Sequence, residues 1–226
     1  MRRTRLPCIA MKLPITDRHE AGRALADRLA TMSLPRPIVV LALPRGGVPI
    51  GALVAQALKA PLDLLLVRKI GAPWQPELAV AAIVDGTPPD IVLDEETMAL
   101  AGVDRAYVET QARNELQEIE RRRAAYLQGR TPIAVEGATV IVVDDGIATG
   151  TTVRAALKAL RRRNPARLVL AVPVAPSDTL EALRSEVDDI VCLAEPCPFH
   201  AIGLHYRDFH QVSDDEVLAA LAAAGG

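Results

Sequence analysis

Two adjacent aspartates, followed at once by small and hydroxyl-bearing residues, form the stretch of this chain best suited to chemistry. Residues 140–152 read V-I-V-V-D-D-G-I-A-T-G-T-T, so an apolar run ends on Asp144 and Asp145. Carboxylates accept hydrogen bonds, and this pair suits a ligand that donates them, such as vicinal hydroxyls or hydrated magnesium. The threonine hydroxyls, together with the unpaired N–H groups of a helix expected to begin near Thr151, suit an anion. A sugar phosphate would satisfy both halves of the stretch.

The elements that must hold this stretch alternate between strand-like and helix-like segments. Apolar runs predict strands at 38–43, 62–67, 139–144, 167–173 and 189–193. Helices are expected from Thr16 or Asp17, at 48–58, from Asp104 to Gly129, at 151–163 and at 177–185. Strands that are apolar on both faces and separated by helices indicate a parallel sheet covered on two sides. In such a sheet ligands bind at the carboxyl ends of the strands, where the two aspartates lie. We therefore expect a single α/β domain.

Two segments of the chain depart from this alternation. Residues 68–89 hold four prolines, two glycines and a short apolar stretch that could pair as a hairpin, which predicts a mobile flap. The basic run at 120–123 is interpreted as the solvated face of a long helix. Gly146 and Gly150 are expected to permit positive φ next to the ligand.

Composition narrows the classes of function. The chain has 226 residues and a formal net charge of -2, so it lacks the basic footprint of a general nucleic-acid binder. No apolar stretch approaches the length of a membrane span. The three cysteines, with a C-x4-C spacing at 192–197, indicate reduced thiols in a cytoplasmic protein and no zinc site. Residues 1–11 read as an N-terminal extension that could be disordered, and translation could start at Met1 or Met11.

Other nucleotide-binding signatures are missing from the sequence. No G-x-x-x-x-G-K-[ST] occurs, so a P-loop enzyme is disfavoured, and G-G-V-P-I-G at 46–51 lacks the G-x-G-x-x-G spacing of a dinucleotide-binding fold. A plain structural reading of 140–152 also exists, in which aspartates end a strand and threonines cap a helix. The full thirteen-residue string is more specific than that reading requires.

The string at 140–152 resembles the signature of type I phosphoribosyltransferases. In that family two acids hold the ribose hydroxyls of phosphoribosyl pyrophosphate (PRPP), and the turn after them holds the 5′-phosphate. The resemblance implies that Asp144 and Asp145 bind the ribose and, through water, a Mg²⁺ ion. It assigns the 5′-phosphate to Ala148, Thr149, Gly150, Thr151 and Thr152.

Two further segments agree with this resemblance. L-P-R-G-G-V at 43–48 looks like the pyrophosphate loop of the family, often with a cis peptide that would fall at Pro44–Arg45, although the segment alone reads equally well as an ordinary turn. V-R-K-I-G at 67–71 resembles the entry to the flap, where a basic pair approaches pyrophosphate; the alternative is a flap flanked by solvated basic residues. The residues so implied for pyrophosphate binding are Arg45, Gly46, Gly47, Arg68 and Lys69, of which Arg45, Arg68 and Lys69 are the catalytic candidates.

The acceptor is the part of the reaction that the sequence does not identify. Ala148 stands where 6-oxopurine enzymes of the family carry an Asp for the purine, which argues against the usual hypoxanthine and guanine activities. The segment around 196–212 is expected to form a small C-terminal hood over the acceptor. Trp74 in the flap and Tyr206 and Phe209 in the hood are candidates for contacting a base. Trp74 could equally be an exposed loop anchor, and packing beneath the sheet edge is the alternative, slightly favoured, for the hood aromatics.

The resemblance implies a type I phosphoribosyltransferase fold over residues 12–226, with its core at 38–195, a flap at 68–90 and the hood. It implies a Mg²⁺-dependent transfer of phosphoribose from PRPP to a nitrogenous base, with release of pyrophosphate, in nucleotide metabolism. A non-catalytic PRPP sensor with the same fold is the alternative. We expect a cytoplasmic homodimer by family analogy, acting on small molecules and contacting neither nucleic acid nor membrane.

Overall fold

A five-stranded parallel sheet forms the centre of the computed structural model, which describes residues 11–224 except 87 and 128. The prediction for the first ten residues lies outside this range. The strands are β1 (Ile38–Ala42), β2 (Leu62–Leu64), β6 (Thr139–Val143), β7 (Arg167–Val174) and β8 (Asp189–Ala194). They pair in the order β2-β1-β6-β7-β8, and every pair is parallel. The predicted α/β domain with a parallel sheet is confirmed.

Helices cover both faces of this sheet because consecutive strand residues point to opposite sides. Ile141 and Val143 belong to one buried cluster, with α1 (Arg18–Ala30), α2 (Gly47–Leu58) and α7 (Asp214–Ala224). Val140 and Val142 belong to the other cluster, with α5 (Thr151–Arg162) and α6 (Ser177–Leu183). As predicted, Asp17 caps α1, and its carboxylate accepts from the N–H of Glu20. The described helices include none long and apolar enough to cross a membrane.

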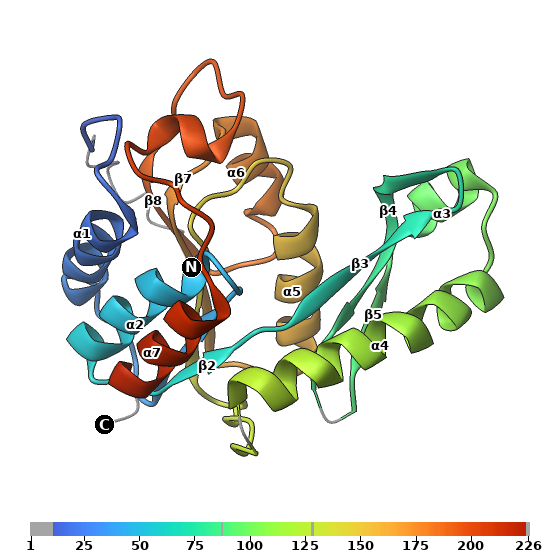
Figure 1. The fold of residues 1–226 in the computed structure, drawn as a ribbon, viewed down its shortest axis with the longest axis horizontal. Coiled ribbons are helices and arrows are strands. Elements are labelled where there is room, and N and C mark those ends of the chain that lie inside the picture. Colours follow the sequence, from blue (N-terminus) through green and yellow to red (C-terminus); the bar gives the residue numbers. More distant parts are fainter. Residues whose placement is uncertain (1–10, 87, 128, 225–226) are drawn as a thin grey trace.

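A second, antiparallel sheet projects beside the core (Figure 1). It consists of β3 (Val67–Ala72), β4 (Gln75–Val84) and β5 (Asp90–Leu93), accompanied by α3 (Glu95–Ala101) and α4 (Arg105–Leu127). The predicted hairpin is present as β3 and β4, but the segment is larger than a simple flap because β5 and two helices join it. The predicted strand at 62–67 was wrong, since β2 ends at Leu64 and Val67 already pairs with Val84. Both pieces are apolar, so hydrophobic pattern alone does not reveal where the pairing partner changes.

The C-terminal hood folds back over the carboxyl ends of the core strands. It contains one short 3-10 turn, η1 (Ile202–His205), and its Ile15–Tyr206 bridge ties it to the segment before α1. Figure 1 shows α5 lying between the parallel sheet and the antiparallel sheet. The projecting sheet meets the core along α5, from the cavity lined by Thr151 and Lys158 to the ion pair between Arg162 and Asp90.

Candidate functional site

Residues from five separate segments line one small cavity at the carboxyl ends of β1 and β6; four of these segments are ones that the sequence singled out, and the fifth is α4. The volume of the cavity is about 150 Å³, and its lining includes Pro44, Arg68, Asp144 and Thr152. These residues come from the P-R-G-G loop, the start of β3, the end of β6 and the first turn of α5. The sequence assigned each of these segments to one ligand, and the fold brings them together.

The P-R-G-G loop packs directly against the two aspartates. A methyl group on Gly46 would lie 1.9 Å from Oδ2 of Asp145, and one on Gly47 would lie 2.7 Å from the carbonyl oxygen of Val143. Only glycine permits this approach, because real side-chain carbons do not come so close to other atoms. The expected cis peptide is present at Pro44–Arg45. The N–H of Gly47 already donates to the carbonyl of Leu43 (3.0 Å), so this amide is not open to a ligand.

Arg18 holds the second aspartate, a contact that the sequence did not reveal. Its Nε and Nη2 lie 2.9 and 2.8 Å from Oδ2 of Asp145, and both side chains are about nine-tenths buried. Its Nη1 donates to the carbonyl of His210 (2.8 Å), and its guanidinium lies 4.0 Å from the centre of the Phe209 ring. A basic residue in the first turn of a helix is disfavoured by the helix dipole. That position of Arg18 was the one signal of a special role.

The two aspartates have different surroundings. Asp144 lines the cavity, and its Oδ1 accepts from the N–H of Asp145 (2.8 Å). Enclosure by protein, and then the neighbouring charge of Asp145, raise the pKa of Asp144 well above its usual range. Burial also raises the pKa of Asp145, while the Arg18 guanidinium opposes that rise. Asp144 is thus the acid that faces the cavity, and Asp145 is the acid tied to the protein.

The turn after the aspartates has the form expected of an anion site. Gly150 adopts φ +74° at the start of α5, and no side chain caps the first turn of this helix. The hydroxyls of Thr149 and Thr151 are exposed and only 3.5 Å apart, a weak contact that leaves them able to meet a ligand. Gly146 is not among the glycines with positive φ, contrary to expectation. Its small size is needed because a methyl group there would lie 2.5 Å from the Ile202 side chain.

The basic residues expected to meet pyrophosphate are mostly engaged by acids. Arg68 forms an ion pair with Glu115 of α4 (2.6 Å), and Arg45 lies 3.6 Å from Asp214 at the start of α7. Lys69 follows Arg68 on the same strand, so its side chain takes the opposite face, and it is not among the residues lining the cavity.

Part of the basic run at 120–123 belongs to the site, which corrects its interpretation as a solvated face. Arg122 lines the cavity beside Arg68 and pairs with Glu118 (2.7 Å). Arg123 lies 3.4 Å from Asp85. The sequence missed this role because α4 has to pack against the β3–β4 hairpin before these side chains reach the site.

Comparison with known proteins agrees with this geometry. A sequence model described as "Phosphoribosyl transferase domain" matches residues 18–206, which is most of the chain. The chain belongs to this phosphoribosyl transferase family. The matched range includes every segment of the cavity and also Arg18.

Similar proteins support this membership. Two Mycobacterium tuberculosis proteins, from strains H37Rv and CDC 1551 / Oshkosh, are each 46% identical over 215 residues and are named "Putative phosphoribosyl transferase" (Rv0571c and MT0597). The match covers 95% of this chain but 47% of theirs, so the chain spans about half the length of these relatives. The crystal structure of TT1426 from Thermus thermophilus is 39% identical, with a TM-score of 0.82 over 92% of this chain and 98% of that one. The predicted family and fold are confirmed, and the family match supports the expected enzyme class, a pentosyltransferase.

The three acceptor candidates do not meet in this phosphoribosyl transferase fold. Tyr206 is buried and its hydroxyl donates to the carbonyl of Asp145 (2.7 Å), while Phe209 packs on Tyr206 with ring centres 5.0 Å apart. Trp74 lies at the β3–β4 turn, is 63% exposed, and its indole N–H is 3.4 Å from the carbonyl of Ala101. Tyr206 and Phe209 therefore contact Asp145 and Arg18 inside the protein. This arrangement agrees with the alternative in which the hood aromatics pack against the protein rather than against a base.

Proposed function

We propose that this chain is a phosphoribosyltransferase that binds PRPP with Mg²⁺ and transfers the phosphoribosyl group to a nitrogenous base, releasing pyrophosphate. The cavity shared by Pro44, Arg68, Asp144 and Thr152 is the observation that carries the proposal. It joins an acid able to accept from ribose hydroxyls to an open helix N-terminus able to bind a phosphate. Family membership supports the same reaction.

In this reaction a nitrogen of the base forms a bond to C1 of the ribose. The bond from C1 to the pyrophosphate oxygen breaks, and its electron pair leaves with pyrophosphate. Positive charge develops on the sugar ring and negative charge on the leaving group, so cationic groups near the leaving group lower the barrier. Arg68 and Arg122 line the cavity and Arg45 lies on the loop beside it. Arg45 and Arg68 would have to exchange Asp214 and Glu115 for pyrophosphate.

Asp144 and Asp145 divide the positioning of the ribose between them. Asp144 accepts from the ribose hydroxyls, since its carboxyl lines the cavity. Asp145 can bind the ribose directly only if Arg18 releases its Oδ2. Otherwise Asp145 helps to position Asp144, because its backbone N–H donates to Oδ1 of Asp144. The 5′-phosphate occupies the turn formed by residues 148–152. Ile119 and Arg122 from α4 line the cavity and would limit the access of water to the reacting carbon.

The residues present fit a magnesium ion held mainly by its substrate. Within the described part of the chain, no three His, Cys, Asp or Glu residues gather as an all-protein metal site. Mg²⁺ commonly binds through one or two carboxylates, waters and substrate phosphates, which suits Asp144, with Asp145 as a second ligand if Arg18 releases it. When bound, the ion supplies positive charge that offsets the charge of the departing pyrophosphate.

A PRPP-binding protein without turnover is the second candidate. This candidate is favoured by the ion pairs of Arg45 and Arg68, because both arginines are bound to acids of the protein and catalysis would need their positive charges at the pyrophosphate. The two candidates differ in one measurable property, the release of pyrophosphate.

The test is to incubate the protein with PRPP, Mg²⁺ and a panel of purine, pyrimidine and pyridine bases while following pyrophosphate release. We expect release with at least one base, and a loss of at least about a hundredfold in Asp144→Asn, because charge-assisted hydrogen bonds are lost. Asp27→Asn is the matched control, since Asp27 is exposed on α1 away from the cavity. Tight PRPP binding without release for any base would favour the sensor, and no PRPP binding would refute both candidates.

The expected assembly and location remain part of this proposal. We propose a cytoplasmic homodimer, by analogy with the family. Light scattering after size-exclusion chromatography tests the assembly, because a monomer at micromolar concentration would contradict it.

A further inference from the structure

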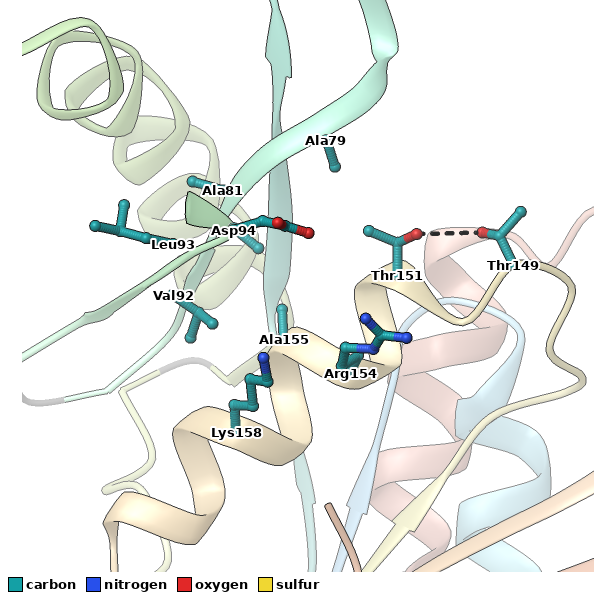
Figure 2. A pocket seen from close by; sticks show the side chains of 11 residues that line it. Ala79, Ala81, Val92, Leu93, Asp94, Thr149, Thr151, Arg154, Ala155 and Lys158 are labelled. Atoms are coloured by element: carbon teal, nitrogen blue, oxygen red, sulfur yellow. Dashed lines mark hydrogen bonds between the residues drawn. The ribbon is translucent and has the colours of Figure 1, made fainter. Parts of the chain in front are cut away.

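A second cavity lies on the other side of the 148–152 turn, between α5 and the antiparallel sheet (Figure 2). Its volume is about 110 Å³. Thr149 and Thr151 line it from the turn, Arg154 and Lys158 from α5, and Asp94 from the end of β5. None of these five residues lines the cavity that contains Asp144. The turn therefore separates two cavities.

The α5 wall carries positive charge that the protein leaves largely uncompensated. Arg154 and Lys158 are one helical turn apart, so their like charges repel each other. The first turn of α5 contains no acidic residue that could offset them. The exposed guanidinium of Arg154 has no ion pair or side-chain hydrogen bond to any described residue, and Lys158 reaches only Glu186, at 3.9 Å. An anion in the cavity would relieve this repulsion.

The wall opposite α5 contains Asp94, which indicates a second chemical group that the ligand should carry. Figure 2 shows the Asp94 carboxylate facing Thr151 across the cavity. Its Oδ1 accepts from the N–H of Thr97 (3.0 Å) at the start of α3, which fixes the carboxylate in place. A carboxylate repels an anion but accepts from a hydroxyl. Between the charged groups the β4 wall is built of small side chains, including Ala79 and Ala81, which leaves room for a carbon skeleton.

We infer that this cavity is a second binding site for a small phosphate ester that carries hydroxyl groups, of the sugar-phosphate type. The phosphate binds Arg154, Lys158 and the Thr151 hydroxyl, and a hydroxyl of the ligand donates to Asp94. The site is separate from the proposed PRPP site, but Thr149 and Thr151 belong to the turn that borders both. An occupant would thereby order the turn that receives the 5′-phosphate of PRPP.

Calorimetric titration of the whole chain with D-ribose 5-phosphate tests the inference, since this probe can enter both cavities. We expect two equivalents to bind. The double variant Arg154→Gln and Lys158→Gln should lose one of them or bind it at least about tenfold more weakly, while Asp144→Asn should affect the other. Arg161→Gln is the matched control on α5, because Arg161 pairs with Asp188 outside the cavity. Asp94→Asn keeps a good helix cap and should weaken binding of ribose 5-phosphate but not of inorganic phosphate.

The outcomes separate this site from the proposed function. One equivalent that is insensitive to the double variant but lost in Asp144→Asn would overturn the second site and leave the PRPP site standing. One equivalent lost in the double variant but unchanged in Asp144→Asn would support the second site and count against the PRPP site. One equivalent lost in both variants would show a single composite site and overturn the inference. Absence of binding would overturn it as well.

Discussion

Replacement of Arg18 by methionine should destabilise the protein and disturb the acid pair at the same time. Methionine keeps much of the apolar stem of arginine but removes the charge and the three hydrogen-bonding nitrogens. Asp145 would then be a buried carboxylate without its partner, since both of its contacts to Arg18 are made through Oδ2. The variant also loses the hydrogen bond to His210 and the contact with the Phe209 ring.

The expected loss of stability follows from the burial of the pair. Because the two side chains are only 9% and 12% exposed, solvent screens their attraction weakly. Removal of one member of a buried pair costs about 3–5 kcal/mol in the free energy of unfolding. Without Arg18, the effect of burial on Asp145 would be opposed less strongly, so the folded-state pKa of Asp145 should rise further above the unfolded value. Asp145 of the variant can then take up a proton, so the loss of stability should be smallest near pH 4, where the lost His210 and Phe209 contacts remain, and should grow as the pH rises through the folded-state pKa.

Guanidinium chloride unfolding followed by circular dichroism, at pH 5 and pH 7, measures this loss. Arg23→Met is the matched control, because Arg23 is exposed on the same helix and, among the described residues, its side chain hydrogen-bonds to the nearby His19 alone. Its change should stay within about 0.5 kcal/mol. Arg18→Lys should recover part of the stability, since an ammonium can make one of the two contacts.

A loss below about 1 kcal/mol at pH 7, or equal losses in Arg18→Met and Arg23→Met, would refute the reasoning, since the cost of an unpaired buried charge is larger. A deficit that grows as the pH falls would refute the assigned protonation of Asp145.

Three further predictions follow from the same contacts. Gly46→Ala should lower the free energy of unfolding by about 1–3 kcal/mol and abolish PRPP binding, because the added methyl group would overlap the Asp145 carboxylate. Unchanged stability together with unchanged PRPP binding would contradict the packing of the loop. The pKa of His210 should lie above its usual value in an NMR titration, through its hydrogen bond to Glu216 and then through Asp208, and Glu216→Gln should lower it; an unchanged pKa would argue against the contact. The pKa of His205 should lie below the usual value, first because of burial and then because of the charge of His200, so it should titrate at a lower pH than His210 in the same spectra.

The order of elements could be predicted from the sequence because the information is local. Helix and strand periods, the cap formed by Asp17 with the N–H of Glu20, and the glycine at the start of α5 each depend on residues within a few positions of one another. The same holds for the signature at 140–152, which gathers two acids and an open helix N-terminus in thirteen residues.

Other features of the fold and of the site could not be predicted from the sequence, because they depend on which elements pack against each other. The split of the predicted 62–67 strand into β2 and β3 required the partner strand β4, and the entry of Arg122 into the site required α4 to lie against the hairpin. Tyr206 and Phe209 are suitable for stacking on a base, but packing turned them toward Asp145 and Arg18.

The sequence by itself determined the α/β alternation, the family and the segment that carries the acids and the phosphate turn. Only the tertiary structure decided which acid faces the cavity, because Arg18 lies 127 positions before Asp145 and the two meet only when α1 packs on the sheet. It likewise decided that α5 presents Arg154 and Lys158 to a second cavity. The physical reason is that local pattern depends on backbone geometry and hydrophobicity, whereas a charge acquires its partner only when distant elements have packed.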